Sequence, residues 1–406
     1  MSREQEQNAV VSVESRALVH VPRTKGYWEK VASVYSLIFR LLLIALPLYV
    51  VVFMAICARA FTYESMFCFF KDLKATTSFV TSDYQSVLYT YEEGESLVLP
   101  YRGGVAAVSG NGIEIFSPDG ERLLGLEEKR VLPRAVASRK YLITYDFGKN
   151  DFTVTNTYAK LHEGDAGFPI YAAEVSDTGH FALITAAKDH LSQVLLYDGN
   201  FNLVQRFQKA SAVTGVALSE NGKYIALVAL TSESGQERTV LELYRIGATT
   251  PTAMAFFENE QPVAVDFTND RHIALLTDKA LRVLDLDGDI KSEVCYTGTP
   301  VAFDSNEDGC VLVIRTDAMQ ANNRVVLLDK KSKVCYDAMQ QGDVTSLSMA
   351  AQRAFLLMNG RIVAISAEDG GVSTYACETG AAHVFAIDDG HVRVVYDGEA
   401  RLYLTD

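Results

Sequence analysis

The sequence predicts an all-β fold, an eight-bladed β-propeller, after one N-terminal transmembrane helix. Three observations carry this prediction: an uninterrupted apolar run at residues 41–58, a change after about residue 95 to short β-rich runs separated by Gly, Asp and Asn turns, and a recurrence of those runs about every 40 residues. With 49% hydrophobic residues, 27 Gly and only 9 Pro in 406 residues, the chain is neither disordered nor collagen-like.

The order of these features divides the chain into four parts. We expect a cytoplasmic tail at residues 1–36, the transmembrane helix at 37–60, a stalk at 61–80 and the propeller at 81–406. The whole chain has a net charge of −14, and residues 1–78 carry +3. The remaining residues therefore carry −17. Because so acidic a domain repels phosphate backbones, nucleic acid is not expected as a partner.

The apolar run Leu41–Ala58 reads LLLIALPLYVVVFMAICA and is flanked by Arg40 and Arg59. At about 1.5 Å per residue it spans roughly 27 Å as a helix, close to the hydrocarbon thickness of a bilayer. A buried core helix would need globular sequence on both sides, and a cleaved signal peptide would have a shorter charged leader. We therefore expect an uncleaved single-pass anchor in the cell membrane, with a cytoplasmic N-terminus by the positive-inside rule and an extracytoplasmic propeller.

The stretch after the anchor, Phe61–Ser78, mixes aromatic and charged residues. This composition fits an interfacial stalk helix and fits a simple linker equally well.

The repeat becomes visible when the later segments are aligned. First strands read TGVALS, VAVDFT, VAFDS, TSLSMA and HVFAID, and second strands read FALIT, YIALV, HIALL, CVLVI, AFLLM and HVRVV. A four-stranded unit of about 40 residues is the blade of a β-propeller. We expect blades at about 95–128, 133–164, 169–209, 211–258, 261–298, 299–340, 342–380 and 381–406, or seven blades if the weak second repeat is not separate.

The last repeat ends at Asp406, where every earlier repeat is only finishing its third strand. A propeller closes its ring to avoid an open sheet edge. The β-rich stretch Ser86–Tyr91, before the first blade, is therefore expected to supply the missing outer strand of the last blade.

The stretches VALSENGKYIALV and LRVLDLDG resemble the repeats of YVTN- and WD-type propellers. The full layout, a short tail, one membrane helix, an aromatic stalk and a divergent propeller, is similar to a family of membrane-anchored propeller proteins of unknown function from mostly Gram-positive bacteria. The resemblance implies a propeller on a bacterial cell surface, and it assigns no activity to any residue.

No catalytic or cofactor motif is present: the sequence lacks a Gly-x-Ser-x-Gly elbow, a His-Glu-x-x-His pair and a phosphate loop. We therefore expect no catalytic, cofactor or metal residues. Asp304–Gly309 matches the opening of a calcium loop, and Asp285–Asp289 is a second acidic segment. Arg315 and Tyr296 stand where calcium needs a bidentate carboxylate, so both segments are predicted to be turns.

Three cysteines recur late in successive repeats at intervals of 40 and 42 residues, namely Cys295, Cys335 and Cys377. Equivalent positions on neighbouring blades lie too far apart for a disulfide, so we interpret them as unpaired apolar residues inherited with the repeat.

Three connections between second and third strands are longer than the others: Ala186–Ser192, Thr231–Thr239 and Arg315–Asn323. In a propeller they share one face with the links between blades, and long loops on a rigid scaffold are common binding surfaces. Tolerated surface insertions are the alternative. Strand order predicts that this face points away from the bilayer. Its candidate contacts are Lys188, His190, Arg238, Arg315 and Asp317.

These features favour a binding or scaffold module for a protein, peptide or envelope polymer over an enzyme. The alternative is a lyase or hydrolase with its site at the mouth of the central channel. Carboxylates converging there with His and Arg would favour the enzyme.

Overall fold

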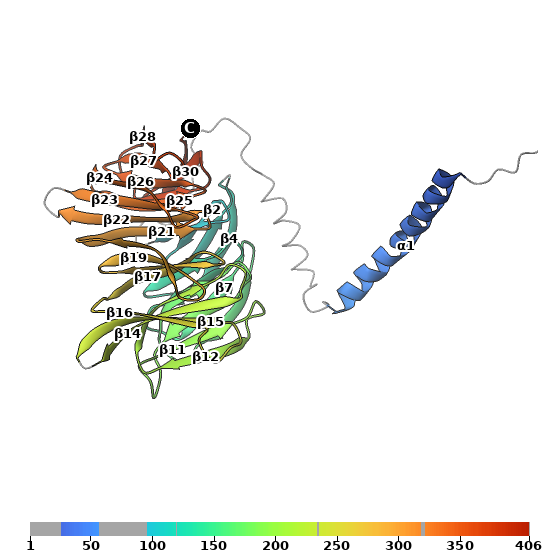
Figure 1. Ribbon diagram of the computed structural model, residues 1–406, viewed down its shortest axis with the longest axis horizontal. Helices are drawn as coiled ribbons and strands as arrows, with labels where there is room; N and C mark the ends of the chain where they lie inside the picture. The colour runs from blue at the N-terminus through green and yellow to red at the C-terminus, as the bar shows by residue number, and fades with distance from the viewer. Residues whose placement is uncertain (1–25, 57–95, 119, 234, 318–320, 406) are drawn as a thin grey trace, which may run out of the picture. The chain divides into compact units, whose positions relative to one another are not determined.

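The computed structural model describes residues 26–56, 96–118, 120–233, 235–317 and 321–405 (Figure 1). The chain forms two compact units, Met1–Phe70 and Lys71–Asp406. Because their relative placement is not determined, each unit is described by itself.

The first unit contains helix α1 (Tyr27–Ile56), which is 30 residues long and includes Pro47. It begins ten residues before the predicted membrane segment and includes most of the apolar run. Large apolar side chains on its described part are exposed, among them Val34, Leu37 and Leu42. Within the described residues, no helix meets the length and hydropathy needed to cross a membrane. The transmembrane helix predicted at 37–60 is therefore not confirmed.

The second unit consists of eight antiparallel sheets, as predicted, and the seven-bladed alternative is excluded. Blades 1 to 4 are formed by β1 (Leu97–Tyr101), β2 (Gly104–Val108), β3 (Gly112–Phe116) and β4 (Arg122–Glu127); β5 (Pro133–Ala137), β6 (Leu142–Asp146), β7 (Asp151–Thr155) and β8 (Lys160–Asp165); β9 (Ile170–Val175), β10 (Phe181–Thr185), β11 (Ser192–Tyr197) and β12 (Leu203–Lys209); and β13 (Ala212–Leu218), β14 (Tyr224–Glu233), β15 (Gln236–Arg245) and β16 (Ala253–Glu258).

Blades 5 to 8 follow the same order. They are formed by β17 (Pro262–Asn269), β18 (His272–Thr277), β19 (Ala280–Asp285) and β20 (Ile290–Cys295); β21 (Thr299–Asn306), β22 (Gly309–Asp317), β23 (Asn322–Asp329) and β24 (Val334–Gln341); β25 (Val344–Ala350), β26 (Arg353–Met358), β27 (Arg361–Ser366) and β28 (Val372–Ala376); and β29 (His383–Ala386), β30 (His391–Tyr396) and β31 (Glu399–Leu404).

The first strand of each blade is innermost, since adjacent blades contact one another through these strands, as in the pairs β13 and β17, β21 and β25, and β25 and β29. Second and third strands are almost continuously buried, because both faces of each sheet pack against a neighbouring blade. One such interface buries Leu281 and Val283 of blade 5 against Leu312 and Val326 of blade 6. The runs of Val, Ile, Leu and Ala that marked the repeat are therefore the inter-blade core.

Blade 8 has three strands in the described part of the chain, and the predicted donor Ser86–Tyr91 lies outside the described residues. Blade 8 also meets blade 1 through a small apolar cluster that includes Val98, Phe116 and Val395. Arg393 on β30, which is 2% exposed, donates hydrogen bonds to the carbonyl oxygens of Gly103 and Pro118 in blade 1. The hydrogen bonds of Arg393 therefore join the first and last blades in addition to the apolar cluster.

The two acidic segments differ from one another. Asp285–Asp289 is a turn, as predicted, in which the Asp285 carboxylate accepts the N–H groups of Asp287 and Asp289 at 3.0 and 2.9 Å. Asp304 instead lies within β21, and the turn begins at Asn306. The prediction of a turn over all of Asp304–Gly309 was wrong at its start, whereas the aligned first strand VAFDS already included Asp304 and Ser305.

The four cysteines of the propeller are unpaired. Cys310 is buried in the second strand β22. Cys295 is exposed and Cys335 and Cys377 are half-buried, so this repeated position lies at the outer edge of the blades and is only partly apolar.

Candidate functional site

The propeller has two faces that are defined by its connections. The link face carries the links between blades and the connections from second to third strands. The turn face carries the turns from first to second and from third to fourth strands. All five predicted contact residues lie on the link face, because each belongs to a connection between a second and a third strand.

Two of the three predicted long loops are strand extensions. β14 and β15 each have ten residues and stay paired out to Glu233 and Gln236, so Thr231 lies opposite Arg238. β22 and β23 likewise stay paired out to Asp317 and Asn322. Second and third strands in the other blades have five or six residues, so these two hairpins project as arms from the link face (Figure 1). The prediction of loops there was wrong.

The sequence contains the reason for the first arm. The stretch TSESGQERT is polar, but its two β-branched Thr residues favour an extended strand, and its other polar residues suit a two-stranded ribbon exposed to water. Gly235 adopts a φ of +82° at the tip, where a left-handed conformation lets the chain reverse. Among the described residues of the three predicted connections, the segment Ala186–Leu191 has no strand and remains a loop.

The predicted contacts lie on blades 3, 4 and 6, and the structure does not gather them on one blade. Lys188 and His190 are exposed in the loop between β10 and β11. Arg238 forms an ion pair with Glu258 of its own blade at 3.3 Å and covers the Phe256 ring at 4.9 Å.

Arg315 and Asp317 lie on the second arm. Arg315 forms an ion pair with Asp343, in the link to blade 7, at 3.1 Å. Asp317 is half-buried at the end of β22. Both arginines therefore hold the arms to the ring as well as presenting charge on the link face.

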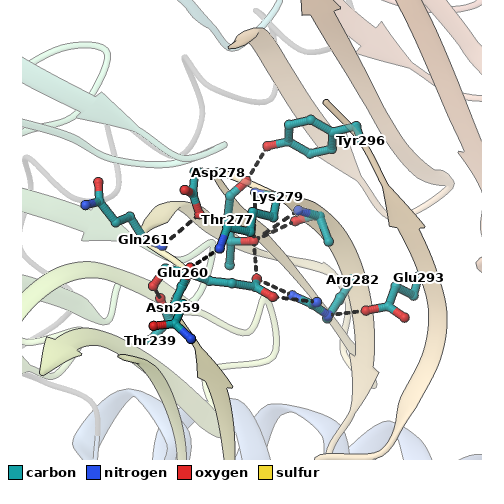
Figure 2. A network of polar contacts seen from close by, with 11 residues as sticks. Thr239, Asn259, Glu260, Gln261, Thr277, Asp278, Lys279, Arg282, Glu293 and Tyr296 are labelled. Carbon is teal, nitrogen blue, oxygen red and sulfur yellow. Dashed lines mark hydrogen bonds and ion pairs between the residues drawn. The ribbon is translucent and has the colours of Figure 1, made fainter. Parts of the chain in front are cut away.

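A buried ionic network fixes the base of the first arm (Figure 2). Glu260, in the link from blade 4 to blade 5, receives two hydrogen bonds from Arg282 of β19 at 2.6 and 2.9 Å. Thr277 donates a third, at 2.5 Å. Arg282 also contacts Glu293 at 2.6 Å and lies over the ring of Phe257 at 4.4 Å. Glu260 and Arg282 are only 9% and 7% exposed, so this is an ion pair with its hydrogen bonds largely satisfied.

The electrostatics of the network favour its charged form. Burial acts to raise the pKa of Glu260, but the hydrogen bonds from Arg282 and Thr277 outweigh it, and the pKa lies below its usual value. Gln261 then extends the network outward, since its side chain donates to Glu237 on the arm at 2.8 Å and its N–H donates to Asp278 at 2.8 Å. The arm is therefore fastened to a rigid inter-blade link.

The turn face has a cavity of about 370 Å³ at the mouth of the central channel. Arg139, in the turn between β5 and β6, reaches the carboxylates of three other blades there. Its Nε lies 3.1 Å from Asp177, and its Nη2 lies 3.8 Å from Glu220 and 4.0 Å from Glu307. One guanidinium thus partly neutralises a ring of acidic turns.

Three further carboxylates lie deeper, on first strands, at corresponding levels of blades 3, 5 and 6. The strand register pairs Glu174 with Ala182, Asp266 with Ala274, and Asp304 with Val311. Asp266 accepts a hydrogen bond from the Ser305 hydroxyl of the next blade at 2.5 Å, and Asp304 accepts the Met349 N–H of the blade after it at 2.7 Å. These contacts join consecutive blades around the channel.

Burial raises the pKa of all three groups. The pKa of Glu174 is raised to about 8, first by burial and then by the charge of Asp266. The pKa of Asp304 is raised to about 7, and that of Asp266 is also raised, in each case mainly by burial. The sequence analysis missed this cluster, although the aligned Asp of VAVDFT and VAFDS was a signal for it.

The expected sign of an enzyme was a set of carboxylates converging with His and Arg at the channel mouth, and the structure shows only part of it. Carboxylates converge, but the hydrogen-bond partners of Asp266 and Asp304 are Ser305 and backbone N–H groups. Arg139 contacts the outer carboxylates instead. Within the described part of the chain, no group of three or more His, Cys, Asp or Glu residues is arranged to hold a metal ion.

A family model for a family of unknown function (DUF5711) matches residues 77–400. The sequence has no significant match among curated proteins. Among solved structures, BamB from Moraxella catarrhalis is similar with a TM-score of 0.53 at 11% identity, over 79% of this chain and 100% of that chain. The WD40 domain of Pan2 from Neurospora crassa is similar with a TM-score of 0.50 at 11% identity, over 80% of this chain and 96% of that chain. At these identities the likeness shows the propeller fold alone.

Proposed function

The chain belongs to DUF5711, a family of unknown function, and we propose that this member is a membrane-anchored, extracytoplasmic β-propeller that binds or scaffolds a protein, peptide or envelope polymer. The observation that carries the proposal is the pair of hairpin arms on the link face. A rigid link holds the base of the first arm, and a preformed surface binds with a smaller loss of conformational entropy than a mobile loop. BamB and the Pan2 WD40 domain share the fold that presents such a face.

The test of binding shortens the three connections together. Residues 231–238 and 316–322 are each replaced by Asn-Gly, and residues 188–191 by a single Gly. Partner capture, measured by crosslinking and co-purification from native membranes, should be lost. The melting temperature should change little, because the removed residues lie outside the inter-blade core. Undiminished capture by this folded variant would contradict the proposal.

The anchor part of the proposal rests on the apolar run Leu41–Ala58 and on the exposed apolar side chains along the described part of α1. A helix that exposes apolar residues on all sides is typical of a membrane segment or a protein core. We expect alkaline carbonate to leave the protein in the membrane, and protease added to intact cells to remove the propeller. Release by carbonate, or protection of the propeller, would contradict the anchor or its orientation.

The channel carboxylates favour a second candidate, a lyase or hydrolase at the channel mouth. A pKa of about 8 keeps Glu174 protonated at neutral pH, as a general acid requires. Binding is preferred because the contacts of Asp266 and Asp304 hold blades together. Turnover of glycan or peptide substrates that Glu174→Gln abolishes and Glu220→Gln retains would reverse this preference.

A further inference from the structure

The link face also carries an apolar surface over blades 2 and 3 that the sequence analysis did not identify. It contains five exposed large apolar side chains, from the link between blades 1 and 2, the β6–β7 turn, the start of β9 and the β10–β11 loop. We call these residues the apolar patch: Val131, Leu132, Phe147, Tyr171 and Leu191. Their exposed fractions run from 45% for Phe147 to 73% for Val131.

Hydrogen bonds hold most of the apolar patch in place. The carboxylate of Asp146, which is 1% exposed, accepts the N–H groups of both Val131 and Leu132. The Phe147 N–H donates to the Leu132 carbonyl at 3.0 Å, and the Phe147 and Tyr171 rings lie 5.9 Å apart. The segments that carry Val131, Leu132, Phe147 and Tyr171 are thus neighbours across blades 2 and 3, and Leu191 lies in the β10–β11 connection of blade 3.

A fixed surface of this kind points to a protein interface. Scattered single apolar residues are ordinary on a protein surface, but a contiguous set is typical of an interaction site. Aromatic and aliphatic side chains on a preformed backbone bury apolar area at little cost in entropy.

The charges beside the apolar patch indicate the chemistry of the partner. Lys129, Arg134 and Lys188 are exposed and lie within three residues of patch members. In the part of the chain that the structure describes, no carboxylate lies within ion-pair distance of Lys129 or Lys188. The exposed acids near these groups are Glu127, Asp189 and Asp151, and Asp151 is paired with Arg130. Lys129, Arg134 and Lys188 therefore outnumber the two remaining acids, Glu127 and Asp189, so the border of the patch is slightly basic in a propeller whose overall charge is strongly negative.

We infer that the apolar patch docks an acidic protein segment, one in which aromatic or branched aliphatic side chains are flanked by Asp or Glu. The inference rests on the proposed binding function and names the partner's chemistry. Apolar side chains of the segment pack on Val131, Phe147 and Tyr171, while its carboxylates pair with Lys129 and Lys188. An anionic membrane is disfavoured as the occupant, because an extended negative surface would meet the acidic propeller as a whole, whereas a short segment meets only the basic border.

The test places a photocrosslinker in the apolar patch of the full chain in native membranes. Phe147 and, separately, Val131 are replaced by p-benzoyl-phenylalanine, and the crosslinked peptides are identified by mass spectrometry. The same replacement at Lys330, exposed in the β23–β24 turn on the turn face, is the control. Both patch positions should crosslink to one acidic and apolar segment of another protein, and Lys330 should not.

Charge reversal then tests the border. Lys129→Glu with Lys188→Glu should lower the Phe147 crosslink yield roughly tenfold, since two exposed ion pairs become repulsive. The matched reversal, Lys330→Glu with Lys331→Glu, should leave it unchanged. Equal melting temperatures of the variants establish that folding is intact.

Four outcomes would overturn the inference: crosslinks to lipid, to a segment without acidic residues, to this chain itself, or to nothing. Loss of capture on shortening the three connections, together with no crosslink at the apolar patch, would leave the proposed function standing and remove only this inference. Undiminished capture by the shortened variant, which also lacks Lys188 and Leu191, together with specific crosslinks at Phe147 and Val131, would contradict only the role of the arms in binding.

Discussion

At the scale of single residues, the channel carboxylates show how burial sets the protonation of the folded protein. The pKa of Asp304 is about 7 in the fold against 3.8 for an ordinary Asp, mainly because of burial. The pKa of Glu174 is about 8 against 4.5, for the same leading reason. At a pH between the ordinary pKa of such a residue and its raised pKa in the fold, the folded protein keeps a proton that the unfolded chain has lost. Stability therefore falls as pH rises from about 4.5 to about 8.

This predicts a melting temperature that is lower at pH 8.5 than at pH 5.5. The double variant Glu174→Gln with Asp304→Asn should reduce that difference, whereas Asp189→Asn, in an exposed loop, should preserve it. Measurements stay above pH 5, because Asp146 and Glu260 have lowered pKa values and their stabilising contribution is lost only in more acidic solution. An unchanged pH dependence in the double variant would show that these groups do not titrate as the structure indicates.

At the scale of elements, the sequence predicted the blades well and the connections less well. The repeat could be recognised in the sequence because each second and third strand is buried on both faces. Such strands are continuous apolar runs, for example FALIT and HIALL. The arms were mistaken for loops because a polar two-stranded ribbon has no apolar alternation to mark it. The network of Glu260 and Arg282, 22 residues apart, was not predictable, since the fold alone brings those residues together.

Ring closure gives the prediction at this scale. Deletion of residues 79–94, which include the predicted donor strand Ser86–Tyr91, should leave blade 8 with an unpaired edge and lower the melting temperature of the propeller by several degrees. Arg393→Met should also lower it, because its hydrogen bonds to Gly103 and Pro118 join the same two blades. If the deletion variant melts like the parent protein, this strand does not close the ring.

At the scale of the whole molecule, the account depends on which face of the propeller binds. The link face presents the two arms and the apolar patch, whereas the turn face presents the cavity and the acidic turns around Arg139. The propeller carries a charge of −17, so the basic groups of the link face are a local feature that complements an acidic partner.

Lysine footprinting of the full chain in native membranes, with and without its crosslinked partner, tests this claim most directly, because both faces carry exposed lysines. Lys129, Lys188 and Lys279 report on the link face, and Lys140, Lys330 and Lys331 report on the turn face. We predict that the partner protects the first three from acylation and leaves the other three as reactive as before. Protection of Lys140, Lys330 and Lys331 with full reactivity of the link-face lysines would contradict the account.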